Sequence, residues 1–170
     1  MMNLYHYAPL KNVVFKNGLS AVSRMSSELK KYAKRVGSNK NEDIITWLEG
    51  TFPGRSRAIS VLTEPVQLQG NDPMLKKWVN QKELIAIDFD KLLKDGLIES
   101  VWCKRASDAN GLNEKIVQIQ PEEIDFSPLP WHLCSKKKGL FFGVIPHYFL
   151  VIKGGIIPPK YLKSVSPIKD

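Results

Sequence analysis

The chain has 170 residues, of which 43% are hydrophobic and 25% charged, so it can form a globular core and is not disordered throughout. No apolar run approaches the roughly 20 residues that cross a bilayer, and residues 1–7 lack the basic and apolar regions of a signal peptide. We therefore expect a single domain over residues 1–170, located in the cytoplasm and without a membrane partner. Export by a route that needs no signal stays open.

The net charge of +8 favours an anionic partner, which can be nucleic acid, an anionic cofactor or an acidic protein surface. The alternative is a basic surface without a specific ligand. The two cysteines and three histidines show no Cys-x-x-Cys pair and no histidine pair at metal-binding spacing. Neither a disulfide framework nor a metal site is predicted.

The first third of the chain predicts one strand followed by helices. Residues 4–8 alternate and end at a proline, which is typical of a short strand that would carry His6. Residues 27–36 predict a helix that ends at Gly37, and residues 38–48 predict a second helix with an apolar stripe. A turn at Asn17-Gly18 separates the strand from these helices.

The rest of the chain predicts mainly strands, at residues 84–89, 97–103, 115–120, 140–144 and 148–153. Short helices are expected at residues 73–79 and 88–93, a loop over 121–138 and a flexible tail at 164–170. Together, the predicted elements indicate an α+β domain with its helices mainly in the N-terminal half.

The stretch from Arg55 to Pro65 holds the densest group of chemically useful side chains. If it is one strand, alternate residues share a face. One face would then carry Arg55, Arg57, Ile59, Val61 and Thr63, and the other Ser56, Ala58, Ser60, Leu62 and Glu64. Neither face is purely apolar, which favours a strand at the wall of a cleft. The alternative is an edge strand with solvated ends.

Three pieces of the sequence resemble the ADP-ribosyltransferase fold. The first is the strand Leu-Tyr-His-Tyr at 4–7 with the Asn-Gly-Leu turn at 17–19. The second is the strand at 57–63, which begins with arginine and carries serine and threonine. The third is a closing strand followed by Ile-Pro-Pro-Lys-Tyr-Leu at 157–162. The resemblance implies two small packed sheets that form a cleft for nicotinamide adenine dinucleotide (NAD).

The resemblance also implies roles for individual residues. His6 would bind the cofactor's ribose, Ser60 or Thr63 would shape the nicotinamide pocket, and Arg55 or Arg57 would bind the pyrophosphate. Tyr7, or its neighbour Tyr5, would supply an aromatic face for the nicotinamide ring. Members of the family cleave the nicotinamide–ribose bond and transfer ADP-ribose to a nucleophile, which here would belong to a nucleic acid or a protein.

The family's catalytic glutamate has no counterpart at the start of the closing strand, which reads Pro-His-Tyr-Phe at 146–149. Glu64 is the best-placed substitute for the acid, with Glu122, Glu123 and Asp125 as other candidates. A different hypothesis is a non-catalytic binding module on the same scaffold, whose basic surface contacts nucleic acid or an acidic protein.

Overall fold

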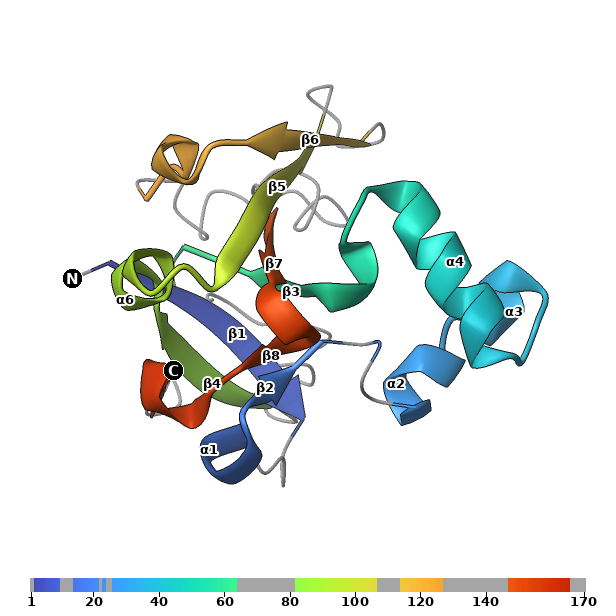
Figure 1. Ribbon diagram of the computed structural model, residues 1–170, viewed down its shortest axis with the longest axis horizontal. Coiled ribbons are helices and arrows are strands. Elements are labelled where there is room, and N and C mark those ends of the chain that lie inside the picture. Colours follow the sequence, from blue (N-terminus) through green and yellow to red (C-terminus); the bar gives the residue numbers. More distant parts are fainter. Residues whose placement is uncertain are drawn as a thin grey trace, which may run out of the picture.

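The computed structural model describes residues 2–9, 14–21, 23, 26–63, 82–106, 114–126 and 147–165. Two antiparallel sheets form its centre (Figure 1). The three-stranded sheet has the order β1-β4-β9, with β1 at Asn3–Pro9, β4 at Lys82–Asp88 and β9 at Leu162–Ser164. The four-stranded sheet has the order β3-β7-β5-β6, with β3 at Ala58–Val61, β7 at His147–Ile152, β5 at Ile98–Ala106 and β6 at Glu114–Ile119. The α+β class is confirmed, with open antiparallel sheets.

The main core lies between these sheets and contains the apolar side chains from one face of each sheet. Ile59 and Val61 on β3 are 3% and 1% exposed, and they join Leu150 of β7 in one buried cluster. From the other sheet, Ile85 and Ile87 of β4 enter the same cluster. Each fully buried aliphatic side chain of this kind stabilises the fold by about 1.5–3 kcal/mol relative to an exposed one. The face of β3 that holds Ile59 and Val61 is therefore a core face.

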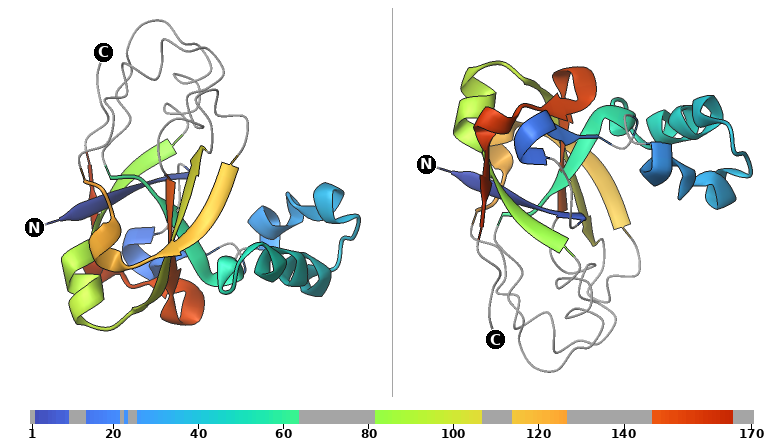
Figure 2. Two further views of the ribbon diagram at one scale, coloured as in Figure 1. Left: turned by 90° about the horizontal axis from the view of Figure 1, so that it is seen from above. Right: turned by 90° about the horizontal axis from the view of Figure 1, so that it is seen from below.

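The helices of the N-terminal half form a separate group, the helical lobe, at residues 26–51. It consists of α2 at Ser26–Lys30, α3 at Ala33–Val36 and α4 at Asn41–Thr51. Leu29, Ile44 and Leu48 form a buried cluster of their own within it. The lobe stands to one side of the sheets, as the three views show (Figures 1 and 2).

The single helix predicted over 27–36 is wrong, because a turn at Lys31 and Tyr32 separates α2 from α3. The predicted end at Gly37 is confirmed: this residue has φ 75°, and its N–H donates to Ala33 O at 2.8 Å. The left-handed φ is accessible to glycine without the penalty that a Cβ atom brings. The helix predicted over 38–48 is confirmed as α4, displaced by three residues at each end.

Short elements connect the sheets. The helix α1 spans Val14–Asn17, and β2 at Leu19–Ser20 pairs with β8 at Ile156–Ile157. The helix α6 at Phe89–Lys94 begins where the side chain of Asp88 accepts a hydrogen bond from Lys91 N. The 3-10 turns η3, η4 and η5 lie at Pro121–Glu123, Lys153–Gly155 and Pro159–Tyr161.

The strands expected near 4–8, 84–89, 97–103, 115–120 and 148–153 are confirmed, as is the brief helix after β4. The loop expected over 121–138 begins instead with η3, followed by the buried Ile124. Ser164, assigned to the flexible tail, belongs to β9, and Val165 N donates to Leu84 O at 3.0 Å. The helix expected at 73–79 and the strand at 140–144 lie outside the described residues.

Candidate functional site

The two sheets meet along β1 and β3, each of which is an edge strand of its own sheet. Tyr5 N donates to Leu62 O at 2.8 Å, and Leu62 N donates to Tyr5 O at 2.9 Å. This is an isolated antiparallel bridge and not a continuous ladder. The bridge therefore joins β1 and β3 at one point. Away from this point, each strand is part of its own sheet.

His6 lies at this junction, one residue along β1 from the bridge. Its side chain is half-buried on the strand face that carries the fully buried Leu4 and Ala8. His6 Nδ1 lies 2.6 Å from the backbone oxygen of Ser60. A carbonyl oxygen only accepts, so Nδ1 carries the proton, and in a neutral ring the lone pair is on Nε2. The prediction that a strand carries His6 is confirmed.

The segment before β3 differs from the prediction. Residues Arg55–Arg57 form the 3-10 turn η2 and not the start of a strand. Gly54 has φ 88°, and Arg57 N donates to Gly54 O at 2.9 Å. A Cβ atom on Gly54 would lie 2.6 Å from Val151 Cγ1, so glycine also permits the close approach of η2 to β7. The two arginines consequently do not share a face with Ile59 and Val61.

The turn lies over the outer face of the four-stranded sheet, which is the face opposite the main core. This face carries Ala58, Ser60, Trp102, Phe149 and Val151. Phe52, just before η2, packs on it: its ring stacks on Trp102 at 4.7 Å between centroids and contacts Phe149 at 5.4 Å. The sequence pattern did not assign Phe52 to the site, and it predicted Trp102 as a core residue or as part of a stacking platform for single-stranded nucleic acid. The alternation of Ser100 and Trp102 along β5 was the available signal.

Arg55 projects from η2 into these aromatic rings. Its guanidinium carbon lies 4.7 Å from the centroid of Phe149 and 5.9 Å from that of Phe52. Burial disfavours the charged form and lowers the pKa of Arg55 from its ordinary value, against a smaller raising effect of Tyr32 in the helical lobe. Within the described residues, no carboxylate forms an ion pair with Arg55.

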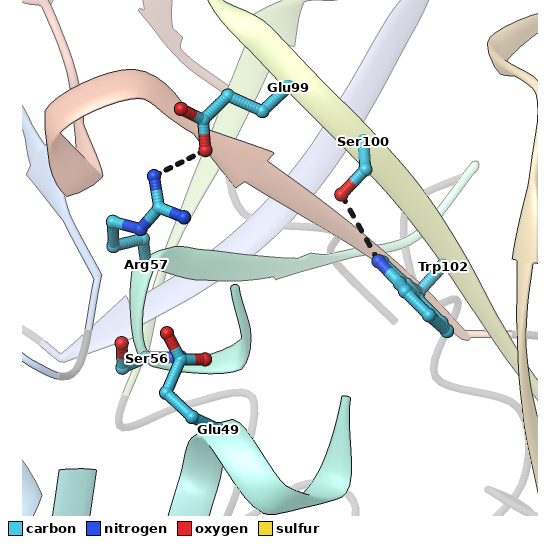
Figure 3. A network of polar contacts seen from close by, with 6 residues as sticks. All are labelled: Glu49, Ser56, Arg57, Glu99, Ser100 and Trp102. Carbon is cyan, nitrogen blue, oxygen red and sulfur yellow. Dashed lines mark hydrogen bonds and ion pairs between the residues drawn. The ribbon is translucent and has the colours of Figure 1, made fainter. Parts of the chain in front are cut away.

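Arg57 has a different environment, because it pairs with Glu99 (Figure 3). Glu99 lies at a register shift between Ile98 and Ser100 of β5, where a β-bulge redirects the side chain. Both partners are more than one third exposed. Nearby, the buried Ser56 donates its N–H to Glu49 of α4 at 3.5 Å. The charge of Arg57 is thus already compensated by the protein.

The other predicted residues lie at or near the junction. Ser60 is exposed on β3 and is the register partner of Phe149, over whose ring Arg55 lies. Thr63 is half-buried immediately after Leu62. Tyr7 is half-buried on β1, on the strand face opposite His6, and pairs with Leu84. His6 therefore contacts the backbone of Ser60, and Ser60 pairs with Phe149, over whose ring Arg55 lies. Arg57 is directed to Glu99.

The predicted acid Glu64 lies outside the described residues. Of the other acidic candidates, Glu122 and Glu123 are exposed in η3, and Glu123 accepts a hydrogen bond from Gln120 N. Asp125 N donates to Tyr148 Oη at 3.1 Å. Neither these contacts nor the other described residues identify the carboxylate that would act as the catalytic acid.

No family model, curated protein or solved structure significantly matches this chain. The ADP-ribosyltransferase resemblance and its cleft therefore stay predictions. Two further searches concern the described residues alone: no helix there is long and apolar enough to cross a membrane, and no group of three His, Cys, Asp or Glu side chains is placed to hold a metal ion.

The chemistry of the junction is suited to an anionic, aromatic ligand. Arg55 presents a planar set of N–H donors that matches phosphate oxygens. Trp102 supplies partly exposed ring surface and Ser60 is exposed on the same outer face, whereas Phe149 between them is 6% exposed and lies beneath Arg55. This combination can bind a nucleotide through its phosphates, its ribose and a planar base.

Proposed function

We propose that the protein binds NAD at the junction of β1 and β3, cleaves the nicotinamide–ribose bond and transfers ADP-ribose to a nucleic acid or protein. The observation that carries this proposal is the position of Arg55. It is a half-buried guanidinium over Phe149, with no ion-pair partner in the described part of the chain.

Arg55, and not Arg57, would bind the pyrophosphate. Partial burial of a charge without a counterion is unfavourable, and a bound phosphate would offset that cost with charge-assisted hydrogen bonds. Arg57 would first have to leave Glu99. The sequence did not decide which of the two arginines would bind the pyrophosphate. Their different environments favour Arg55 over Arg57.

His6 and Ser60 would position the sugar and the leaving group. The Ser60 carbonyl fixes the His6 ring through Nδ1, so Nε2 is the atom that can accept a hydrogen bond from a ribose hydroxyl. The hydroxyls of Ser60 and Thr63 are the candidates for the nicotinamide carboxamide, and Tyr7 or Tyr5 for its ring. These assignments follow the resemblance, and the contact of His6 with the Ser60 backbone supports them.

In the reaction, the bond between ribose C1′ and the nicotinamide nitrogen breaks, and its electron pair leaves with nicotinamide. The acceptor's nucleophilic atom then bonds to C1′ and loses its proton. Positive charge develops on the ribose, so a carboxylate near C1′ stabilises the transition state. Glu64 is the proposed carboxylate, because it follows Thr63 at the end of the strand stretch.

Release of nicotinamide from NAD by the purified protein tests this function. We expect turnover by the wild type and a loss of at least about a hundredfold in Glu64→Gln, since the charge that favours the transition state is removed. Glu42→Gln is the control, because Glu42 is exposed in the first turn of α4. No nicotinamide release by wild type in the presence of nucleic acid or protein acceptors would overturn the transferase. Equal rates for wild type and Glu64→Gln would remove Glu64 as the acid.

A further inference from the structure

Trp47 is a large aromatic side chain that the fold of the helical lobe does not bury. The buried cluster of the lobe consists of Leu29, Ile44 and Leu48. Trp47 belongs to the apolar stripe predicted for α4, yet it is 36% exposed and lies outside that cluster. Its described ring contact is with Tyr32, at 5.9 Å between centroids and 42° between the ring planes. The lobe therefore presents an aromatic surface to solvent.

The chain around these rings is basic. Residues 29–41 hold no acidic residue, and their exposed cations are Lys30, Lys31, Lys34, Arg35 and Lys40. Lys31 pairs with Glu28, and Lys30 donates a hydrogen bond to the backbone oxygen of Asn39. Within the described residues, no carboxylate forms an ion pair with the other three cations. Their charge is therefore available to an external anion.

Helical spacing places two of these cations beside the rings. Arg35 follows Tyr32 by three residues, and residues at this spacing are neighbours on a helix surface. Lys40 precedes Trp47 by about two turns of α4, so both lie on the same side of that helix. The aromatic surface is therefore bordered by positive charge from both helices.

The acidic residues of α4 do not cancel this charge. Glu42 and Glu49 lie roughly 140–160° around the helix axis from Trp47, which places them on the other side of α4. Asp43 lies one turn before Trp47 on the same side, and it accepts a hydrogen bond from Ser38 Oγ at 2.5 Å. The surface around Trp47 thus combines an exposed aromatic ring with a net positive charge.

We propose that this lobe surface, formed by Tyr32, Arg35, Lys40 and Trp47, binds single-stranded nucleic acid. Positive charge alone would fit an acidic protein equally well. The exposed indole favours a strand with unpaired bases, because such bases can stack on an aromatic side chain whereas the bases of a duplex are stacked on one another. Arg35 and Lys40 would contact the backbone phosphates.

The lobe surface also bears on the acceptor of the proposed reaction. The helix α4 leads through Phe52 into η2, the turn that carries Arg55, so a bound strand would lie near the proposed NAD site. This part of the inference rests on the proposed function and narrows its acceptor to nucleic acid. The binding itself requires no NAD.

Fluorescence anisotropy of a labelled single-stranded oligonucleotide of about 12 nucleotides, measured without NAD, tests the binding. We expect Trp47→Ala to weaken it at least about fivefold, as the loss of one stacked base predicts, and Trp47→Phe to retain most of the affinity. Phe15→Ala is the matched control, because Phe15 is 39% exposed in α1, outside the lobe. Thermal unfolding of each variant confirms that it is folded.

The salt dependence of the same binding tests the phosphate contacts. Each contact contributes about 0.7 to the slope of log affinity against log salt for a single strand, so the double variant Arg35→Gln/Lys40→Gln should reduce that slope by about 1.4. The variant Lys94→Gln/Lys163→Gln is the charge-matched control, since both lysines are exposed, in α6 and β9. We expect the control to bind with nearly the wild-type slope.

The outcomes separate this inference from the proposed function. Equal affinity of wild type and Trp47→Ala would overturn the lobe surface, as would binding of the matching duplex or of polyglutamate as tightly as the single strand. Nicotinamide release from NAD by a protein that does not bind the oligonucleotide would support the proposed function and overturn the lobe surface. Oligonucleotide binding that depends on Trp47, in a protein that releases no nicotinamide, would do the reverse.

Discussion

The guanidinium of Arg55 lies 4.7 Å from the ring centroid of Phe149, so a cation of the turn η2 stacks on an aromatic ring of β7. The backbone of the same turn passes so close to Val151 that only glycine fits at position 54. These contacts fix the turn on the outer face of the sheet, beside the edge where His6 meets Ser60. The candidate site is therefore a product of packing between segments that are distant in sequence.

Replacement of Phe149 by leucine should destabilise the protein more than a comparable core replacement. Phe149→Leu keeps an apolar side chain but removes the ring under Arg55, which we expect to cost about 1 kcal/mol beyond the packing loss. Phe89→Leu is the control, since Phe89 is 3% exposed and its described ring contact is with Phe126. Denaturant unfolding of both variants measures the difference. Equal losses would show that the contact with Arg55 adds no stability.

Gly54→Ala should be strongly destabilising. The residue has φ 88°, and the new methyl group would lie 2.6 Å from Val151 Cγ1. We expect a loss of about 2–4 kcal/mol in the free energy of unfolding, the sum of backbone strain and overpacking. Gly37→Ala isolates the backbone part, because its φ is 75° and nothing lies within 4 Å of its Cβ position. A Gly54→Ala loss no larger than that of Gly37→Ala would contradict the close packing of η2 on β7.

Tyr161 should make stability depend on pH in the alkaline range. Its hydroxyl donates to Asp95 Oδ2 at 2.6 Å, and this bond, with burial and the carboxylate charge, raises the pKa of Tyr161 from 10.0 to about 12. Because the folded pKa is the higher one, the stabilisation is present below pH 10 and is lost between pH 10 and 12. Unfolding free energies of wild type and Tyr161→Phe should therefore converge over this interval. A constant difference across it would refute the assignment.

The ion pair between Arg57 and Glu99 should contribute little to stability. Both side chains are more than one third exposed, and solvent and salt screen such pairs. A double-mutant cycle with Arg57→Ala and Glu99→Ala should give a coupling of about 0.2–1 kcal/mol that falls with added salt. A coupling above this range that is insensitive to salt would mean that the pair is effectively buried.

Local patterns predicted most of the strands because their apolar residues alternate and the core takes one face of each. The strand face of Ile59 and Val61 is an example, since both side chains enter the main core. The same alternation, extended back to Arg55, predicted the wrong structure. Gly54 adopts a left-handed conformation and starts a turn, so the period-two pattern stops before β3.

The candidate site could be predicted only in part. His6 and Ser60 were singled out by a resemblance, but their contact depends on the pairing of β1 with β3 across more than 50 residues. The difference between Arg55 and Arg57 depends on Glu99, which a bulge in β5 redirects, and on Phe149, over whose ring Arg55 lies. No local pattern contains that information, because each partner comes from another element.

The most direct test of the proposed site is calorimetric titration of NAD into wild type, Arg55→Ala and Arg57→Ala, with thermal unfolding of each variant to confirm that it is folded. We predict saturable binding by wild type and by Arg57→Ala, and a loss of affinity of at least about tenfold in Arg55→Ala, since charge-assisted hydrogen bonds to phosphate disappear. Arg55→Lys should recover part of the affinity. Absence of binding by wild type at millimolar NAD, or equal affinity of all the variants, would contradict the account.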